Sequence, residues 1–310
     1  MAIAKIMDRI MANNPITTIE YGMFHFEYRT YPELAIREAL MNAFCHADYR
    51  IPGPIIVKHY TDRLEISNPG GFIGGISPNN ILHHQPVSRN PHLVEVLTRL
   101  RLVNRSNLGI PRIYRAMMME GKQPPLIDEQ GESVKITLLA SKFTAPFRAF
   151  VAEEEQAGKD ISIDHMLILQ YLIQHTEIDT STAARICQRK EEDTRRILSA
   201  MESERDYLER GGTGRGTYWV ISRKLYSRLM TPGDFDVRQR TDWDASKTRV
   251  LSILRQRAKR GEKGLSNSEI RQITMLSRYQ VIRLMHELQK ENPQITLERK
   301  GRYSTYSFVD

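Results

Sequence analysis

The chain has 310 residues, of which 40% are hydrophobic and 26% are charged, and its formal net charge is +8. No apolar run approaches the roughly 20 residues that a membrane helix needs, and charged residues interrupt the apolar N-terminus, which excludes a signal peptide. The two cysteines, Cys45 and Cys187, fall on helical patterns and are expected to be buried free thiols. We therefore expect a globular cytoplasmic protein of two or three domains that makes no contact with a membrane.

The first half of the chain is interpreted as one domain, residues 31–145, preceded by a lead-in, residues 1–30, that is expected to be the remnant of a preceding domain. A helix is predicted near residue 40, where Glu38, Asn42 and His46 recur every fourth residue. Because an α-helix turns once in about 3.6 residues, these three side chains share one face. For an isolated E-x-x-x-N pattern, such a face is most often the polar side of an amphipathic helix.

Strand patterns follow this helix. Apolar residues predict a β-hairpin over residues 55–68, which runs into a turn at Gly70-Gly71. A second helix is predicted to open near Gly109, and a further strand is predicted over residues 133–139. The domain is therefore expected to be of the mixed α+β type.

The second half contains two blocks, residues 161–222 and residues 246–310, joined by a linker, residues 223–245. Each block has an apolar helix, a short helix, a longer amphipathic helix and two short strands around a turn. This order is typical of a winged helix-turn-helix domain, and its repetition strengthens the prediction. The predicted fold class is α+β, with an α/β domain followed by two winged helix-turn-helix domains.

The last block carries the charge expected for nucleic-acid binding. Residues 246–310 hold 14 basic residues against 6 acidic ones, an excess that equals the net charge of the entire chain. In a helix-turn-helix the second helix enters the major groove of double-stranded DNA, where arginine and glutamine can read base edges. Basic residues of a wing suit phosphates or the minor groove. The expected DNA contacts are Arg278, Tyr279, Gln280 and Arg283 on the helix and Arg299, Lys300 and Arg302 on the wing.

The first block is acidic by comparison, because residues 151–245 hold 14 basic residues against 18 acidic ones. Its long helix opens near Glu191, Glu192 and Asp193, and these carboxylates would meet phosphates unfavourably. Formation of a homodimer, or a supporting role, is therefore as well supported as direct contact with DNA.

Four phrases in the N-terminal domain match a known family in order and in spacing, namely REALMNAFCHADY, DRLEISNPGGF, SRNP and LGIPRIYRAM. On these phrases, residues 31–140 resemble the ATPase-like domain of bacterial proteins related to RecG, which often follows an AlbA-type, Schlafen-related domain. That domain is a divergent relative of the nucleotide fold of gyrase, Hsp90, histidine kinases and MutL, the GHKL fold. The resemblance implies a GHKL-like α/β sandwich that binds ATP with Mg²⁺, within a chain that is a short version or a fragment of a longer protein. The sequence contains no Walker A pattern that would indicate a helicase.

The resemblance also implies roles for individual residues. Glu38 corresponds to the general base that activates water for attack on the γ-phosphate. Asn42 corresponds to the residue that holds Mg²⁺ against the phosphates. The other implied positions are the adenine loop, Asn68, Gly70 and Gly71, the phosphate-side glycine, Gly109, and a phosphate or structural contact, Arg89.

Two departures from the family pattern bear on the strength of this site. Asn68 stands where the wider fold has an aspartate that accepts a hydrogen bond from the adenine amino group. Asn107 and Leu108 stand where the family often has Gly-Thr, although glycine best suits a backbone that wraps around phosphates. We expect reduced nucleotide affinity or reduced hydrolysis.

These features predict a nucleotide-responsive DNA-binding protein, either a transcriptional regulator or a defence-related factor. Its expected ligands are ATP and Mg²⁺, and its expected partners are double-stranded DNA and a second copy of the chain. Two other functions are open, a DNA-stimulated ATPase of GHKL type and a protein-interaction adaptor with a degenerate nucleotide fold. A metal-dependent hydrolase has less support, because the six histidines before residue 100 lack standard ligand spacing.

Overall fold

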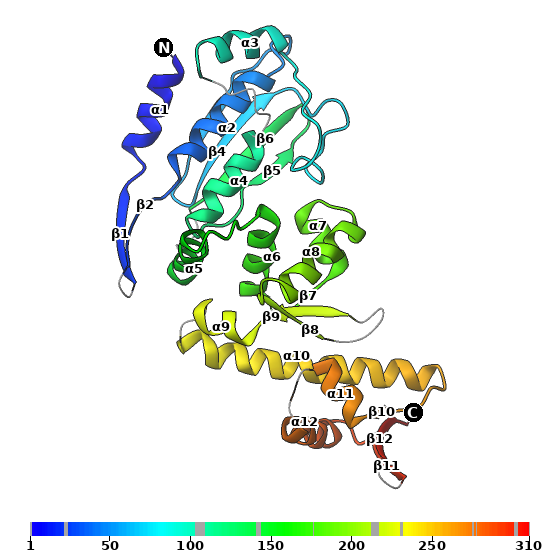
Figure 1. Cartoon of the computed structure of the whole chain (residues 1–310). Coiled ribbons are helices and arrows are strands. Elements are labelled where there is room, and N and C mark those ends of the chain that lie inside the picture. Colours follow the sequence, from blue (N-terminus) through cyan, green and yellow to red (C-terminus); the bar gives the residue numbers. More distant parts are fainter. Residues whose placement is uncertain are drawn as a thin grey trace. The chain divides into compact units, whose positions relative to one another are not determined.

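The computed structural model describes residues 2–21, 24–102, 109–140, 144–175, 177–211, 217–229, 232–274, 276, 278–300 and 303–309, without the side chains of 232–242, 278, 279, 299, 300 and a few others. The chain forms two compact units, namely Met1–Gln170 with Ala183–Thr194, and Tyr171–Thr182 with Arg195–Asp310. Figure 1 shows the helices and strands in colours that follow the sequence. Among the described residues, no helix is both long enough and apolar enough to cross a membrane.

The N-terminal domain, residues 2–156, has a mixed α+β fold, as predicted. It begins with α1 (Ala2–Ala12) and an antiparallel hairpin of β1 (Ile16–Tyr21) and β2 (Phe24–Arg29). The helix α2 (Glu33–His46) follows, and the main sheet is antiparallel with the order β3-β4-β6-β5. The remaining elements are β3 (Ile56–His59), β4 (Arg63–Pro69), α3 (Pro91–Arg99), α4 (Gly109–Met119), β5 (Leu126–Glu129), β6 (Ser133–Leu139) and α5 (Ala145–Gln156).

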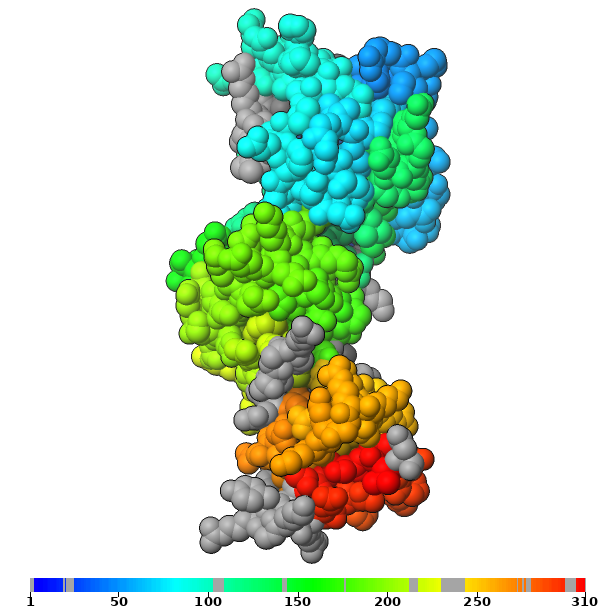
Figure 2. Space-filling view, turned by 90° about the vertical axis from the view of Figure 1, so that its right-hand side faces the viewer, coloured from blue at the N-terminus to red at the C-terminus, as the bar shows by residue number. Residues whose placement is uncertain are grey.

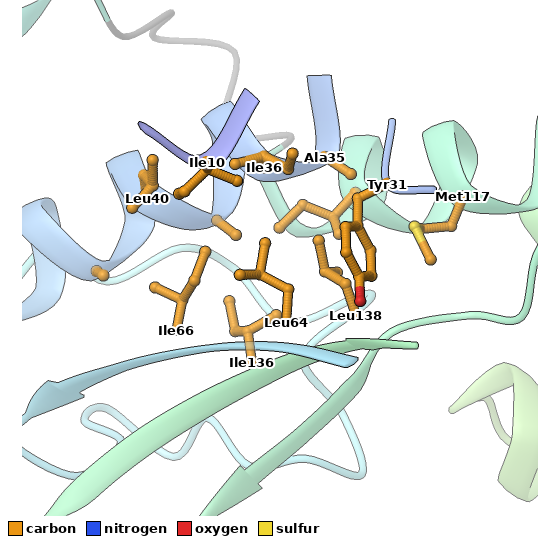
Figure 3. Packing of buried hydrophobic residues seen from close by; sticks show 13 residues of the cluster. Ile10, Tyr31, Ala35, Ile36, Leu40, Leu64, Ile66, Met117, Ile136 and Leu138 are labelled. Atoms are coloured by element: carbon orange, nitrogen blue, oxygen red, sulfur yellow. The ribbon is translucent and has the colours of Figure 1, made fainter. Parts of the chain in front are cut away.

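The core of this domain lies between the main sheet and the helices α2 and α4, which run side by side over it (Figures 1 and 3). In β4, Leu64 and Ile66 are 0% and 1% exposed. Because alternate side chains of a strand point to the same face, Asn68 continues this row and is itself buried. The strand therefore carries an apolar row that ends in an amide, next to the turn that leaves the sheet.

The lead-in, residues 1–30, packs onto the same core through the buried side chain of Ile10. Asn14, also buried, closes the β1-β2 hairpin at its base. Its Nδ2 donates to the carbonyl oxygen of Tyr31 at 2.7 Å, and its Oδ1 accepts from the backbone N–H of Tyr31 at 2.9 Å. A buried backbone group left without a partner costs about 1–3 kcal/mol, so this amide fixes how the chain enters α2.

The two C-terminal blocks repeat one order of elements: helix, short strand, helix, helix, hairpin. In each, the short strand pairs with the last strand, which gives three-stranded sheets in the orders β7-β9-β8 and β10-β12-β11. The sequence predicted the helices and hairpins but not the short strands. The first block contains α6 (Ile163–Gln174), β7 (Ile178–Asp179), α7 (Thr180–Cys187), α8 (Glu191–Ser203), β8 (Leu208–Gly211) and β9 (Tyr218–Ile221). The second contains α10 (Pro232–Lys259), β10 (Leu265–Ser266), α11 (Asn267–Thr274), α12 (Arg278–Glu291), β11 (Ile295–Lys300) and β12 (Tyr303–Phe308).

Much of the segment interpreted as a linker, residues 223–245, is helical, because it forms α9 (Arg223–Leu229) and the beginning of α10. The core of the second block lies beneath α12, where Val281, Leu284, Met285 and Leu288 are all buried. These residues recur at helical spacing, as expected for the apolar face of an amphipathic helix.

Candidate functional site

A cavity of about 460 Å³ lies in the N-terminal domain, bordered by α2, the end of β4 and the start of α4. Residues 70–90, called the wall segment, lead from β4 towards α3 and line much of this cavity. Figure 2 shows the wall segment in cyan on the surface of the domain. Apolar side chains of β5 and β6 also line the cavity. The structure brings all the residues expected at a nucleotide to this one cavity: Glu38, Asn42, Asn68, Gly70, Gly71, Arg89 and Gly109.

The helix α2 presents Glu38, Asn42 and His46 to this cavity, as their spacing requires. Asn42 lies against the first turn of α4, where a Cβ on Gly109 would stand 2.9 Å from its Oδ1. Its amide nitrogen is buried and has no hydrogen-bond partner among the described residues. A Cβ at position 109 would therefore displace this amide, which still has a donor to satisfy.

Glu38 is engaged by an arginine that the sequence did not point to. Arg112 Nη1 donates to Glu38 Oε1 at 3.3 Å, and the two side chains are 33% and 20% exposed. Arg112 lines the same cavity and follows Gly109 by less than one turn of α4. Its place in the phrase LGIPR, directly after the phosphate-side glycine, was the signal that could have identified it.

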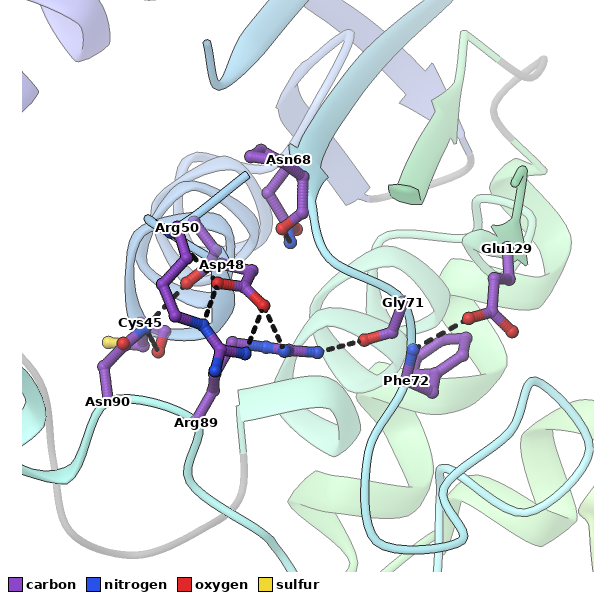
Figure 4. Close-up of polar contacts among 11 residues, drawn as sticks. Cys45, Asp48, Arg50, Asn68, Gly71, Phe72, Arg89, Asn90 and Glu129 are labelled. Carbon is purple, nitrogen blue, oxygen red and sulfur yellow. Dashed lines mark hydrogen bonds and ion pairs between the residues drawn. The ribbon is translucent and has the colours of Figure 1, made fainter. Parts of the chain in front are cut away.

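A buried carboxylate, Asp48, holds the wall segment in place (Figure 4). Arg50 donates to its two oxygens at 2.9 and 2.8 Å, and Arg89 Nη1 donates to Oδ2 at 3.0 Å. Arg89 Nη2 also donates to the carbonyl oxygen of Gly71 at 2.5 Å. The hydrogen bonds from Arg50, and then its charge and that of Arg89, hold the pKa of Asp48 well below its ordinary value of 3.8. Arg89 is thus bound on two sides within the wall of the cavity.

The turn at Gly70-Gly71 fits this arrangement closely. Gly70 has a φ of +92°, and a Cβ there would stand 2.7 Å from the Cβ of Asp48. At Gly71 a Cβ would overlap Oε1 of Glu129, which accepts a hydrogen bond from the backbone N–H of Phe72 at 2.9 Å. Glycine is therefore required at position 70, for its backbone conformation and for space, whereas a Cβ at position 71 would push the Glu129 carboxylate away. Sequence reasoning missed Glu129, because nothing local marks a partner so far along the chain.

Two titratable groups in the cavity are electrically neutral near pH 7. Burial, and then the positive charge of Arg89, lower the pKa of His46 from its ordinary 6.5. Burial, and then the charge of Glu38, raise the pKa of Cys45 to about 11. Cys45 and Cys187 are buried free thiols, as the sequence predicted.

The wall segment is also held from outside the domain, by the turn between α7 and α8. Gln188 Oε1 accepts from the backbone N–H of Leu82 at 2.9 Å, and its Nε2 donates to the carbonyl oxygen of Pro78 at 2.9 Å. His83 Nε2 lies 2.9 Å from the carbonyl oxygen of Cys187. All these residues belong to the same compact unit. Gln188 holds its side chain in this position from a left-handed backbone conformation, with φ of +54°.

In the last block, Gln280 and Arg283 are exposed on α12. Arg283 Nε donates to Glu287 Oε1 at 3.1 Å, and its guanidinium lies 5.2 Å from the ring centroid of Trp243. Hydrogen bonds from Trp243 and Lys247 lower the pKa of Glu287 to about 2. The other expected contacts fall outside what the structure describes: the side chains of Arg278, Tyr279, Arg299 and Lys300, and Arg302 entirely.

No group of three or more His, Cys, Asp or Glu side chains that could hold a metal ion by itself is found in the described part of the chain.

We predict that Asp48→Asn destabilises the protein near neutral pH and that the deficit narrows in acid. Because the pKa of Asp48 is depressed in the folded state, the ionised carboxylate adds to the free energy of unfolding above pH 3.8, its ordinary pKa. This contribution is lost as the pH falls below 3.8. Urea unfolding of the variant and of the wild type, from about pH 7 to about pH 3, measures the difference between their free energies of unfolding. The matched control is Asp62→Asn, whose exposed carboxylate pairs with Arg63. A deficit for Asp48→Asn that is independent of pH would contradict the assignment.

Comparison with known proteins supports an ATPase-type domain in the N-terminal half of the chain. Residues 53–138 match the family described as "Putative ATP-dependent DNA helicase recG C-terminal", a family of the ATPase type. The crystal structure of the DIP2311 protein from Corynebacterium diphtheriae is similar to this chain, with a TM-score of 0.62 and 27% sequence identity. The similarity covers 73% of this chain and 46% of that one, so the chain spans less than half the length of DIP2311. No curated protein matches the chain. The resemblance to the RecG-related ATPase-like domain therefore holds over residues 53–138.

Proposed function

We propose that this protein binds a nucleoside triphosphate with Mg²⁺ in the N-terminal cavity and binds double-stranded DNA through its last block, with the nucleotide controlling the DNA-binding half. One observation carries the first part: the residues that the ATPase-like family would place at a nucleotide all line one cavity. The match of residues 53–138 to a family of the ATPase type supports it. ATP is the nucleotide to test first.

The chemistry of the cavity suits such a ligand. Its base would lie near Asn68 and the apolar side chains of β5 and β6, and its phosphates near the N-terminus of α4, where backbone N–H groups favour anions. Asn42 supplies an amide oxygen of the kind that Mg²⁺ accepts, and its unpartnered nitrogen can donate to a phosphate. Since Mg²⁺ commonly reaches a site together with phosphates, a protein-only cage is not needed.

The two C-terminal blocks support a winged helix-turn-helix assignment. Each has the expected order of helices and hairpin, and each adds the short strand that completes a three-stranded sheet. In the last block α12 stands in the position of the recognition helix, and the face opposite its core carries Arg283, His286 and Lys290, all exposed. We infer that this face enters the major groove and that the strongly basic composition of the block supplies phosphate contacts.

Gln188 supplies a route from the cavity to the C-terminal half. Its side chain bonds to two backbone groups of the wall segment, and α8 begins only three residues later. A nucleotide that repositions the wall segment would act on the turn that precedes this helix. The nucleotide affects DNA binding only if the arrangements of the C-terminal half with and without nucleotide differ in their affinity for DNA.

The first experiment tests nucleotide binding. We expect Mg-ATP and a non-hydrolysable analogue to raise the thermal midpoint of the wild-type protein, by an amount equivalent to about 2.7 kcal/mol at a nucleotide concentration of roughly 100 times Kd. Asn42→Ala should lose most of this shift, because it removes the amide at the phosphates. The control is Asn13→Ala, an exposed asparagine that bonds to its own helix. Absence of any shift in the wild type would refute nucleotide binding, and a phosphate-release assay then separates binding from turnover.

The second experiment tests the DNA contact. We expect Arg283→Ala combined with Arg302→Ala to weaken binding to duplex DNA and to reduce the slope of log affinity against log salt by about one for each phosphate that is no longer neutralised. The measurement is a fluorescence anisotropy titration at several salt concentrations. The matched control, Lys58→Ala with Arg99→Ala, removes the same charge from exposed positions in the N-terminal domain. Equal effects in both double variants would show that the last block is not the contact.

The third experiment tests the coupling. We expect the DNA affinity of the wild type to change with Mg-nucleotide and that of Gln188→Asn to stay constant, while both still bind nucleotide and DNA. Asparagine tolerates the left-handed backbone of this position, but its side chain is too short to make both bonds. Ser203→Ala, at the exposed end of α8, is the control. A nucleotide effect of unchanged size in Gln188→Asn would exclude this route.

A further inference from the structure

Two arginines line the cavity among the described residues, and they are held very differently. Arg89 is 14% exposed in its side chain and is bonded to Asp48 and to the carbonyl oxygen of Gly71. Arg112 is 33% exposed and makes one hydrogen bond, of 3.3 Å, to Glu38. Redirecting Arg89 would break the wall of the cavity, whereas redirecting Arg112 would break a single long ion pair. Arg112 is therefore the arginine available to an incoming anion.

The position of Arg112 suits the far end of a phosphate chain. It lies in the first turn of α4, whose start at Gly109 packs against Asn42. Glu38 and Asn42 are one turn apart on α2, so Arg112, Glu38 and Asn42 surround one end of the cavity. A phosphate chain that reached Asn42 would bring its terminal group towards the ion pair of Arg112 and Glu38.

We propose that Arg112 is the residue by which the site distinguishes a nucleoside triphosphate from a diphosphate, and that it leaves Glu38 when it binds the terminal phosphate. This inference rests on the proposed nucleotide function. The planar guanidinium donates two parallel hydrogen bonds to a phosphate, which is a better partner than one carboxylate oxygen at 3.3 Å. With a diphosphate bound, no terminal phosphate competes, and Arg112 remains on Glu38.

The exchange of partners also controls the base. While Arg112 donates to Glu38 Oε1, it occupies an acceptor site that a water molecule could otherwise use. Once Arg112 has moved, Glu38 accepts a proton from a water molecule while the water oxygen bonds to the terminal phosphorus. The bond from that phosphorus to the bridging oxygen breaks, and the bridging oxygen keeps the electron pair on the departing diphosphate. The products are the nucleoside diphosphate and inorganic phosphate, with the proton on Glu38.

The test compares affinities of the full chain for a non-hydrolysable ATP analogue and for ADP, both with Mg²⁺, by isothermal titration calorimetry. We expect Arg112→Ala to weaken binding of the triphosphate analogue by roughly tenfold or more and to change ADP affinity by less than about twofold, because a charge-assisted bond is lost only to the terminal phosphate. Glu38→Gln should tighten binding of the analogue, because it removes the carboxylate that competes with the terminal phosphate for Arg112. The control is Arg115→Ala, one turn further along α4, where the guanidinium pairs with Glu155 and Asp160.

The outcomes separate this inference from the proposed function. If the wild type binds neither nucleotide, the proposed function fails and this inference fails with it. If the wild type binds both and Arg112→Ala weakens both equally, or neither, nucleotide binding stands and the role of Arg112 is refuted. Should Arg112→Ala fold poorly, Glu38→Gln decides the matter: analogue affinity that does not rise relative to ADP refutes the exchange.

Discussion

The hydrogen-bonded carboxylate of Asp48 joins three parts of the chain that the cavity needs in fixed positions. Asp48 follows α2 directly, and its backbone N–H donates to the carbonyl oxygen of Pro69 at the end of β4 at 2.8 Å. Its side chain binds Arg89, which in turn binds the Gly70-Gly71 turn. Asn90, which follows Arg89 in the sequence, donates hydrogen bonds from its Nδ2 to the carbonyl oxygens of Cys45 and Ala47 at the end of α2.

A buried carboxylate is costly unless its oxygens are well bonded, and here two guanidinium groups satisfy them. This is why a loop rich in glycine and proline can form a wall. The loop turns apolar side chains such as Phe72, Ile73 and Leu82 towards the cavity, and directional bonds from Arg89 hold its backbone in position. The apolar core beneath α2 and α4 supplies the stability, and the Asp48 contacts decide where the cavity opens.

Local patterns were sufficient to predict part of this site. The four-residue spacing placed Glu38 and Asn42 on one face of α2, and the family resemblance assigned Asn68 to the site. The contacts between distant residues could not be predicted, because the pairs Arg112 with Glu38, Arg89 with Asp48, and Glu129 with the N–H of Phe72 are far apart in sequence and follow no period. The short strands β7 and β10 were missed for a related reason: two residues carry too little alternation to be recognised before their partner strands are placed. In the last block, likewise, the apolar spacing along α12 gives no sign that Glu287 contacts Trp243, Lys247 and Arg283.

The contact between Gly71 and Glu129 has a consequence for how this site can change in evolution. Any side chain at position 71 would meet the Glu129 carboxylate, and Glu129 also holds the N–H of Phe72. The two positions are therefore coupled. A lineage that first shortens Glu129 gives up one hydrogen bond and becomes free to vary position 71. A lineage that first replaces Gly71 must turn the flexible Glu129 side chain away and gives up the same hydrogen bond. On either path Glu129 no longer holds the N–H of Phe72, so relatives with a larger residue at 71 are expected to carry a smaller one at 129.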